Sequence, residues 1–445
     1  MGFIMDLPDN LKYILSALEN AGFEAYVVGG AVRDKLLGVN CEDHDVTTNA
    51  KTEDILRIFS DCKIIPTGLK HGTVTVIYNG SSFEITTFRS DGEYTDMRHP
   101  DKVTFVTNIN EDLARRDFTV NSMAYSKTLG FIDVFNGQND LNERTLRAVG
   151  DPEKRFEEDA LRIIRAVRFA AKLGFSIEEN TLKAAYKKLD NLSKLSVERV
   201  FSELTLTLCA KHAPFALDKY RKIFFAVLPE LSAMDGCEQY NRSHSYNVYE
   251  HTLKALESCE NVTPIIAWAI ILHDAGKPFT RIVGEDGFQH FPDHWIVSEE
   301  IAVKVLTRLK APKAFIDEVR FLVLYHDNLL LGGKPYLKRL LKKYKTSYID
   351  DLFVVKKADL YAHSEFGIKR FEPYYEKSLK EYREIIENDE CYSFDKLDIS
   401  GDEIKALGFS GKKVGQLLGV ALDAVIDGKI PDEKDKIIEF IKNYE

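Results

Sequence analysis

YVVGGAVRDKLLGVNCEDHDVTT, residues Tyr26 to Thr48, is the stretch that decides the fold of this chain. Its apolar beginning predicts a short strand that ends in Gly29-Gly30, and a helical pattern follows as far as Gly38. A strand, a glycine turn and a helix N-terminus in this order bring backbone N–H groups close to a phosphate. Arg33, one turn into the predicted helix, is placed to contact the same anion.

Two acidic residues, Asp43 and Asp45, follow this helix as a D-x-D pair on a predicted strand, HDVTT. Because side chains alternate along a strand, both carboxylates face the same side. Paired carboxylates beside a phosphate-binding turn suit Mg²⁺ and nucleotide phosphates. Glu84 lies on a later predicted strand, and it either adds a third carboxylate to the metal site or faces solvent. A lone Gly-Gly or a lone D-x-D is most often a plain turn or a solvated pair, so the prediction rests on their order.

The ordered set GG-x-VRD-x-LLG…D-x-D resembles the nucleotidyltransferase signature of tRNA nucleotidyltransferases (CCA-adding enzymes) and of bacterial poly(A) polymerases. These families belong to the DNA polymerase beta-like superfamily, and further motifs extend the resemblance over nearly the whole chain. It implies an α+β fold, in which a polymerase-beta-like mixed α/β nucleotidyltransferase head precedes all-α neck, HD and tail regions. The expected boundaries are 1–150 for the catalytic head, 151–235 for the neck with a base-reading motif, 236–370 for the HD domain and 371–445 for the tRNA-binding tail.

The composition is that of an ordinary globular protein, with 44% hydrophobic and 29% charged residues. The chain length of 445 residues suggests about three domains. Six scattered cysteines without a CxxC pattern predict reduced thiols in a cytoplasm rather than disulfides or a zinc–thiolate site. The N-terminal residues predict no signal peptide, and the longest apolar run, Ile265 to Leu272, is too short to cross a bilayer.

The net charge of −10 argues mildly against binding to nucleic acid, but the charge is unevenly distributed. Residues 328–346 contain basic side chains and no acidic ones. The basic residues are Lys334, Lys338, Arg339, Lys342, Lys343 and Lys345. A basic helix on an acidic protein is either a phosphate-binding face or a solvated helix surface, and the sequence leaves both interpretations open.

LARRDFTVNSMAY, residues Leu113 to Tyr125, resembles the RRDFT-x-N-A motif of the same families, with Ser122 in place of the usual alanine. The resemblance implies that Arg116 contacts the triphosphate or the ribose. It also implies that Asp117 and Asn121 hold the ribose or a neighbouring loop. Without the family motif, two arginines beside an aspartate are more typical of a surface ion pair.

Four charged residues recur every three positions on one predicted helix, Phe156 to Phe175: Asp159, Arg162, Arg165 and Arg168. By itself the stripe is typical of an ion-paired surface helix, but it begins in EDALR, which resembles the base-reading E-D-x-x-R motif of the family. Cytosine and adenine present an amino donor beside a ring-nitrogen acceptor, whereas uracil and guanine present the reverse order. An aspartate that accepts from the amino group and an arginine that donates to the ring nitrogen therefore admit CTP and ATP. Arg165 and Arg168 are then directed at phosphates or at the RNA end.

A second set of motifs, rich in histidine, lies further along the chain. The order His…His-Asp…Asp, with the adjacent pair at the end of an apolar helix, resembles the HD phosphohydrolase superfamily. The matched metal ligands are His251, His273, Asp274 and Asp359, and the residues that extend the site are expected among His290, His294 and His326. Imidazole nitrogens and carboxylates suit a transition metal or Mg²⁺ that activates water. The alternative is an HD fold that is kept as an RNA-binding scaffold.

Two further stretches resemble parts of CCA-adding enzymes. The polar stretch Asp91 to Val103 resembles a flexible loop that CCA-adding members carry and some CC-only members lack. The tail, Ile399 to Asp432, resembles the C-terminal module of CCA-adding enzymes that have an HD domain. Within it, Gly411-Lys412-Lys413 precedes a predicted helix, whose N-terminus suits an RNA phosphate. The tail pattern favours tRNA as the primer.

The motifs together predict an enzyme that adds CCA to tRNA 3′ ends from CTP and ATP without a nucleic-acid template. The expected cofactors are Mg²⁺ in the head and a second divalent metal in the HD domain. The expected partners are tRNA, CTP and ATP, with no membrane. Three alternatives remain open: a poly(A) polymerase, an enzyme that adds only CC or only A, and an HD phosphohydrolase with an RNA-binding head.

Overall fold

The computed structural model describes residues 5–39, 41, 44–69, 72–91, 103–327 and 332–444. Two parts of the sequence expectations, Asp43 and most of the polar loop before the RRDFT motif, lie outside these residues. The chain divides into two compact units, Met1–Val227 and Leu228–Glu445, which are described separately below.

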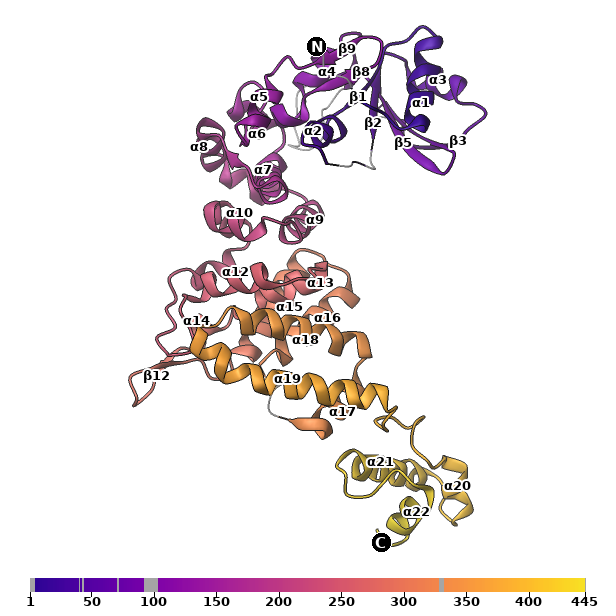
Figure 1. Cartoon of the computed structure of the whole chain (residues 1–445), viewed down its shortest axis with the longest axis vertical. Coiled ribbons are helices and arrows are strands. Elements are labelled where there is room, and N and C mark those ends of the chain that lie inside the picture. Colours follow the sequence, from indigo (N-terminus) through magenta and orange to yellow (C-terminus); the bar gives the residue numbers. More distant parts are fainter. Residues whose placement is uncertain are drawn as a thin grey trace. The chain divides into compact units, whose positions relative to one another are not determined.

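The first unit begins with a seven-stranded sheet, in which the strand order is β3-β4-β5-β2-β1-β8-β9 (Figure 1). The strands are β1 (Ala25–Val28), β2 (Asp45–Thr48), β3 (Lys63–Gly68), β4 (Thr73–Tyr78), β5 (Ser81–Thr87), β8 (Ala124–Ser126) and β9 (Gly130–Ile132). A separate antiparallel pair consists of β6 (Arg89–Asp91) and β7 (Val103–Phe105). β2 is antiparallel to β1 but parallel to β5, so the sheet is mixed. The expected mixed α/β head is confirmed.

The local patterns of the head form as the sequence predicts. The helices are α1 (Asp9–Asn20), α2 (Gly30–Leu36), α3 (Thr52–Ile58), α4 (Ile109–Ala114) and α5 (Gly137–Asn142), with a 3₁₀ turn η2 (Thr119–Asn121). α1 buries Leu11, Ile14, Leu15 and Leu18, which lie on one helical face. Asn79 and Gly80 join β4 to β5 and both have positive φ angles, as a tight hairpin turn requires.

From Pro152 the first unit is helical apart from β11 (Ser176–Ile177), which pairs in parallel with the earlier strand β10 (Thr145–Leu146). The helices are α6 (Pro152–Glu158), α7 (Leu161–Leu173), α8 (Glu179–Lys187), α9 (Val197–Leu208), α10 (Ala213–Lys219) and α11 (Arg221–Val227), with η3 (Leu189–Lys194) as a 3₁₀ turn. α7 packs on α9 and α10.

The single helix expected over Phe156 to Phe175 is wrong, because the chain breaks between α6 and α7. Asp159 has an extended backbone, with φ −144° and ψ 102°. Its carboxylate accepts a hydrogen bond from the backbone N–H of Leu161 at 3.0 Å. An aspartate that caps the first turn of a helix stabilises such a break, because it satisfies an amide that has no partner within the helix. Asp159 therefore precedes the helix that carries the three arginines.

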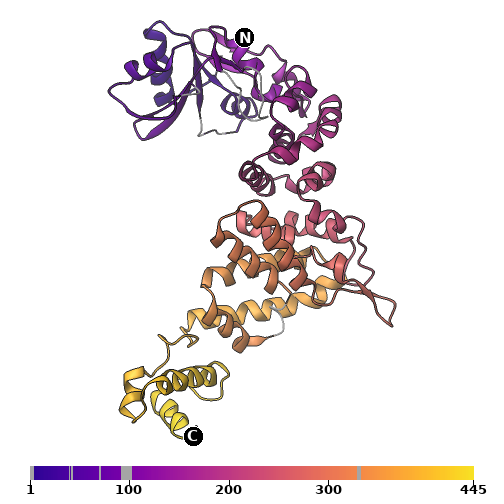
Figure 2. The ribbon, with the colours of Figure 1, turned by 180° about the vertical axis from the view of Figure 1, so that it is seen from behind.

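The second unit is almost entirely helical (Figures 1 and 2). Its helices are α12 (Val248–Ser258), α13 (Pro264–Leu272), α14 (Lys277–Thr280), α15 (His294–Arg308), α16 (Lys313–Tyr325), α17 (Gly333–Lys343), α18 (Thr346–Tyr361), α19 (Glu365–Glu387), α20 (Gly401–Ala406), α21 (Lys412–Ile426) and α22 (Lys434–Lys442), with the 3₁₀ turn η4 (Pro229–Met234) and the short strands β12 (Ile282–Val283) and β13 (Gln289–His290). α13 is apolar on every side because it lies in the core, where it packs against α12, α16 and α18. Among the described residues, no helix has the length and apolar character that a membrane span requires. The expected α+β class, with an α/β head followed by helical regions, is confirmed.

The basic helix α17 is largely neutralised by neighbours from the same unit. Lys334 lies 2.6 Å from Glu390 and 2.9 Å from Glu384, and Lys338 lies 2.9 Å from Glu390. On the next turns, Arg339 forms an ion pair with Asp427, and Lys342 with Asp423. These basic residues therefore join α17 to α19 and α21, rather than forming the uniform phosphate-binding face that one interpretation of the sequence suggested.

The last three helices share a hydrophobic core of their own. This core contains Ile404 from α20, Leu417 and Leu422 from α21, and Ile437 and Ile441 from α22. Gly411 directly precedes α21 and has φ 62°, a left-handed backbone conformation that favours glycine. The tail is thus a packed helical module.

Candidate functional site

Two carboxylates of the head lie opposite each other on adjacent strands. Asp45 is the first residue of β2, and Glu84 is its register partner on the parallel strand β5. Neighbouring strands lie about 4.8 Å apart, and paired residues point to the same face of the sheet. Both side chains are exposed to solvent. Two accessible carboxylates in this arrangement suit a divalent cation, because hard cations bind oxygen ligands.

Arg116 lies beside the glycine turn and interacts electrostatically with Asp45. Gly29 ends β1 with φ 68°, and a Cβ atom at this position would lie 2.9 Å from Nη1 of Arg116. The positive φ favours glycine at this position, and the arginine approaches the turn closely. The charge of Asp45 acts on the Arg116 guanidinium, which also lies 3.5 Å from Asp112. α2 then begins at Gly30. The two family motifs thus meet at one place.

A buried polar network connects the glycine turn to the helices that follow the sheet. Arg33 donates to Oδ1 of Asn121 at 2.5 Å, and Asn121 donates to Oδ1 of Asp117 at 3.1 Å. The other oxygen of Asp117 accepts two hydrogen bonds from Arg165, at 2.6 and 2.9 Å. These expected nucleotide-binding residues are thus held by one another, across a sequence separation of more than a hundred residues. The network fixes α7 to the part of the head that carries the glycine turn.

The charge of Asp117 is stabilised within this network. Burial raises the pKa of its carboxyl, but Arg165 and the Asn121 amide outweigh burial and lower the pKa to about 2. The Asp117 carboxylate is therefore ionised at neutral pH and holds Arg165 in place.

Three arginines surround one buried aromatic ring on α7. The guanidinium carbons of Arg33, Arg165 and Arg168 lie 5.5, 5.4 and 4.4 Å from the centroid of Phe169. Glu203 on α9 balances part of this charge, at 3.4 Å from Arg165 and 2.8 Å from Arg168. Cations of this kind are attracted to an aromatic face. The cluster concentrates positive charge near the predicted nucleotide site.

The two residues of the base-reading motif have protein partners in this structure. Asp159 forms an ion pair with Arg199 on α9 at 2.7 Å. Arg162 donates to Glu158 at 2.6 Å and to the backbone carbonyl groups of Arg155 and Arg115, at 3.1 and 3.0 Å. Either side chain would therefore have to release at least one of these partners before it could bind a base.

Two residues of α9 were missed by the sequence interpretation. Arg199 and Glu203 stand four positions apart, so they share one face of the helix, and that face meets Asp159 and Arg168. Glu203 is only 8% exposed, which is unusual for a charged residue without a structural or functional reason. The signal in the sequence was the spacing of four positions between these two charges in the helical segment VERVFSELTLTL.

The departure from the family motif at Ser122 has a simple structural explanation. Ser122 is fully buried, and its hydroxyl donates to the carbonyl oxygen of Leu113 at 2.6 Å. A buried hydroxyl with a partner carries no unsatisfied hydrogen bond. The motif therefore keeps its conformation with serine in place of alanine.

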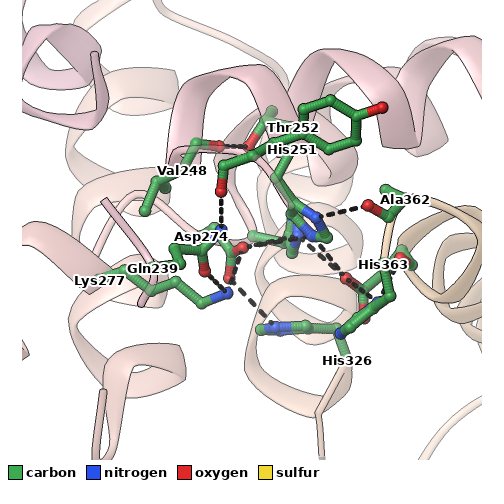
Figure 3. Close-up of polar contacts among 12 residues, drawn as sticks. Gln239, Val248, His251, Thr252, Asp274, Lys277, His326, Ala362 and His363 are labelled. Carbon is green, nitrogen blue, oxygen red and sulfur yellow. Dashed lines mark hydrogen bonds and ion pairs between the residues drawn. The ribbon is translucent and has the colours of Figure 1, made fainter. Parts of the chain in front are cut away.

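The second site, here called the HD centre, consists of His251, His273, Asp274 and Asp359. All four residues are buried, and Figure 3 shows His251 and Asp274 directed towards the same point. The Nε2 atom of His251 lies 2.9 Å from Oδ1 of Asp359, and that of His273 lies 3.2 Å from Oδ2 of Asp274. Among the described residues, Nε2 of His273 and both oxygens of Asp274 lack hydrogen-bond partners, although Lys277 lies 2.7 Å from Oδ2. Buried polar atoms without such partners, from residue types that bind metals, fit a divalent cation.

The three further histidines differ in their relation to this centre. His294 and His326 are buried beside it, and their Nε2 atoms lie 3.3 and 3.8 Å from Oδ1 of Asp274. His290 is half exposed and lies on β13, where its imidazole contacts Asp286 at 3.2 Å. The first two therefore extend the centre, whereas His290 lies on the rim of the cavity.

The electrostatics of the HD centre keep its carboxylates ionised. Burial raises the pKa of Asp274, but His273 and Lys277 outweigh burial and hold that pKa well below its usual range. Lys356 has the same effect on Asp359. Burial lowers the pKa of His273, but Asp274 and Asp359 raise it to about 10. The centre thus combines the negative charges of two carboxylates with the positive charge of the His273 imidazolium.

A cavity of about 930 Å³ opens onto the HD centre. Besides Asp274 and Asp359, its lining includes the cationic residues Arg242, Lys277, Lys356 and Arg370 and the aromatic residues Phe291, Trp295, Phe366 and Tyr374. Cations beside a metal-binding centre suit a phosphate group, and aromatic rings suit a planar base.

Two known domain families match the parts of the chain that hold these two sites. The Poly A polymerase head domain matches residues 25–147, and the HD domain matches residues 242–363. Between them, residues 174–234 match a family described as "Probable RNA and SrmB- binding site of polymerase A". The expected combination of a nucleotidyltransferase head with an HD domain is confirmed.

Individual relatives extend the same similarity. The chain is 54% identical to a CCA-adding enzyme of Lactobacillus helveticus over 190 residues, which is 43% of this chain and 47% of that relative. The chain thus spans about half the length of this and similar curated relatives. The crystal structure of the Bacillus stearothermophilus CCA-adding enzyme in complex with CTP superposes with a TM-score of 0.73 at 28% identity, covering 98% of both chains. The Thermotoga maritima CCA-adding enzyme complexed with tRNA shares the fold, with a TM-score of 0.62 at 21% identity over 99% of this chain and 97% of that chain.

Proposed function

We propose that this chain, a homologue of CCA-adding enzymes with a poly(A) polymerase head and an HD domain, is itself a CCA-adding tRNA nucleotidyltransferase. One observation carries the proposal: the glycine turn, Arg116 and the carboxylates of Asp45 and Glu84 lie together on one face of the head. The substrates would be CTP, ATP and the 3′ end of tRNA, and the tail module would hold the tRNA. The boundaries at residues 150, 235 and 370 remain part of this proposal.

The reaction we propose is attack of the tRNA 3′ hydroxyl on the α-phosphate of CTP or ATP, with release of pyrophosphate. Asp43, Asp45 and Glu84 would hold Mg²⁺, which lowers the pKa of a bound hydroxyl and neutralises phosphate charge. Arg116 would hold the triphosphate against the glycine turn. Arg33, Asp117 and Asn121 would keep this surface rigid, since they already hold one another. The enzyme would act in the cytoplasm, as its six free thiols suggest.

Selection of cytosine and adenine would rest on Asp159 and Arg162. Asp159 accepts a hydrogen bond from the exocyclic amino group, and Arg162 donates to the ring nitrogen. Because Asp159 caps α7 and contacts Arg199, binding of a base would replace the Arg199 contact and leave the cap in place. Arg165 and Arg168 lie on the next turns of α7 and face Glu203, so they would act on phosphates or on the RNA end.

We expect Asp159→Ala to relax base selection by roughly ten- to a hundredfold, because a good base contact contributes about 1–3 kcal/mol of discrimination. The carbonyl groups of UTP and GTP would no longer be repelled. The measurement is single-nucleotide incorporation into tRNA ending in CC, with kcat/KM compared for all four nucleotides. Glu157→Ala is the matched control, since Glu157 belongs to α6 and is half exposed beside Lys188. An equal loss for all four nucleotides would show that Asp159 is only structural.

A poly(A) polymerase and an A-adding enzyme are the nearest alternatives. Neither extends a primer with CTP. The enzyme proposed here adds two cytidines to a tRNA that ends at the discriminator base, and it adds adenosine only after them. Supplying CTP alone therefore distinguishes the proposal from both alternatives.

A second function, hydrolysis of a phosphoester, is supported by the HD centre. The observation that favours it is the buried Asp274, whose Oδ1 has no hydrogen-bond partner among the described residues, at the end of a cavity lined by cations and aromatic rings. A divalent cation held by His251, His273, Asp274 and Asp359 would supply an activated water and polarise the phosphoryl oxygen. Lys277 and Arg370 would bind the phosphate group.

Replacing both His273 and Asp274 by alanine should abolish this hydrolysis and leave CCA addition unchanged, because neither residue belongs to the head. Release of phosphate from nucleoside 2′,3′-cyclic phosphates and from a panel of phosphomonoesters, with several divalent metals, measures the loss. His290→Ala, on the rim of the same cavity, should retain hydrolysis. A wild-type chain that binds no metal and hydrolyses no member of the panel would reduce the HD domain to a scaffold.

A further inference from the structure

We infer that Asp112 is a positioning residue for nucleotide binding in the head, because its carboxylate holds Arg116 in the orientation that a triphosphate needs. Asp112 lies on α4 and is fully buried, at 0% exposure. A buried carboxylate is costly unless it is paired, so the partners of Asp112 indicate what it does. The inference rests on the function proposed above, in which Arg116 holds the triphosphate against the glycine turn.

The two oxygens of Asp112 have different partners. Oδ1 accepts a hydrogen bond from Nε of Arg115 at 2.9 Å and one from the backbone N–H of Arg89 at 3.3 Å. Nη2 of Arg115 also lies 2.9 Å from this oxygen. Oδ2 lies 3.5 Å from Nη2 of Arg116 and 3.5 Å from the hydroxyl group of Thr47. The contact to Arg116 is therefore made by an oxygen that Arg115 does not occupy.

Asp112 connects Arg116 to the strand that carries a predicted metal ligand. Thr47 stands two residues after Asp45 on β2, so the two side chains lie on the same face of the sheet. α4 packs against the sheet through Leu113, which shares a hydrophobic core with residues of β1. The carboxylate of Asp112 thus anchors Arg116 to the face of the sheet that presents Asp45.

Arg116 needs such an anchor because most of its side chain is buried. The side chain is 18% exposed, and burial lowers the pKa of its guanidinium, an effect that the charge of Asp112 opposes more than any other group. Among the residues that the structure describes, the buried Nε of Arg116 has no hydrogen-bond partner. The protein therefore does not use every donor of this guanidinium. Arg115, Arg116 and Asp112 together keep a net positive charge, which favours a phosphate group.

The substitution Asp112→Asn separates the orientation of Arg116 from the charge of the site. Two nitrogens of Arg115 and the Arg89 N–H all face Oδ1, so the amide oxygen stays on that side. The amide NH₂ group then faces Arg116, and two donors form no hydrogen bond. Loss of a negative charge would by itself strengthen the binding of a phosphate. Weaker binding therefore reports a lost orientation and not the altered charge.

The experiment measures equilibrium binding of CTP, ATP and inorganic tripolyphosphate to the full chain in the presence of Mg²⁺, by isothermal titration calorimetry. We expect Asp112→Asn to weaken binding of all three by about tenfold, the lower end of the loss when a partner that orients a binding group is removed. The Kd for tRNA should remain unchanged. In an Arg116→Gln background, Asp112→Asn should have no further effect. Glu111→Gln, the matched change at an exposed position of α4, should leave binding unchanged.

Two results would overturn the inference. Equal or tighter binding by Asp112→Asn would show that the orientation of Arg116 does not depend on the carboxylate. A loss that persists in the Arg116→Gln background would show that Asp112 acts on another part of the head. If Asp112→Asn does not fold, Asp112→Ser gives the same decision, because it also removes the contact to Arg116.

Nucleotide addition is measured separately, so that the inference and the proposed function can fail independently. A chain that binds CTP and ATP but extends no tRNA would contradict the proposed function. The binding constants of Asp112→Asn would still decide the role of Asp112, because they require no transfer reaction.

Discussion

Replacing Asp45 by alanine is expected to reduce nucleotide addition by at least about a thousandfold, while binding of tRNA remains close to that of the wild type. The carboxylate faces Glu84 across the parallel β2–β5 pair and acts on the charge of Arg116. A metal ion contributes several kcal/mol of charge stabilisation in the transition state. At about 1.36 kcal/mol per factor of ten, its loss corresponds to the expected decrease.

The measurement is the rate of a single addition to tRNA under saturating nucleotide, with tRNA affinity followed separately by filter binding. Glu53→Ala provides a control, since Glu53 is an exposed carboxylate on α3 of the same head. Glu84→Ala should cause a loss of similar size if Glu84 is the third metal ligand. Near-normal addition by Asp45→Ala would contradict the metal assignment in the head.

Replacing Asp117 by alanine is expected to destabilise the first unit by about 3 kcal/mol. Its carboxylate holds Arg165 and Asn121, and removing one partner of a buried ion pair costs about 3–5 kcal/mol. We expect the lower end of this range because the Arg165 side chain is 31% exposed and keeps Glu203 at 3.4 Å. Asp117→Asn should cost less, since the amide keeps one acceptor oxygen.

Hydrogen–deuterium exchange in the full chain measures this effect locally. Peptides from residues 113–125 and 161–173 should exchange faster in Asp117→Ala. The two tryptophans, Trp268 and Trp295, both belong to the second unit, so their fluorescence during unfolding is an internal control that should not change. Equal protection of both peptides in the variant and in the wild type would show that the network does not hold α7 to the head.

The lowered pKa of Asp117 predicts how the difference in stability between wild type and Asp117→Ala depends on pH. The pKa of Asp117 is lowered from its ordinary value of 3.8 to about 2 in the folded chain. A group with a lowered pKa stabilises the folded state above its unfolded pKa and loses this effect as pH falls towards its folded pKa. The difference in melting temperature between wild type and Asp117→Ala should therefore be constant near neutral pH and become smaller below about pH 4.

Local features of the fold could be predicted because short patterns determine them. The glycine turn at Gly29 formed as expected, since a few residues set the backbone angles. The relation between Asp45 and Glu84 could only be proposed, because it depends on parallel pairing between strands 39 residues apart in sequence. Pairing of this kind depends on the whole sheet.

The break at Asp159 shows where periodicity misleads. The apolar stripe continues from α6 into α7, so its spacing does not reveal that the aspartate caps a new helix. The basic helix α17 is a second case, because the acids that neutralise Arg339 and Lys342 lie more than eighty residues later, on and beside α21. Net charge along a segment does not predict which charges from distant segments lie beside it.

The HD centre could be predicted to the extent that its residues follow a sequence order. His251, His273, Asp274 and Asp359 are brought together by the packing of α12, α13 and α18. The sequence alone could not separate His294 and His326 from His290, because the packing of the helices decides which of them lies beside Asp274. The folded structure separates them, because the first two are buried beside Asp274 and the third lies on the rim.

The most direct test of the proposed function uses tRNAs that end at the discriminator base, in C and in CC, each incubated with one nucleotide at a time. We predict that CTP alone extends the first two by two and one cytidines and then stops. ATP alone should add a single adenosine to the third tRNA, and UTP and GTP should add nothing. Long adenosine tails from ATP alone, or no addition from CTP, would contradict the assignment as a CCA-adding enzyme.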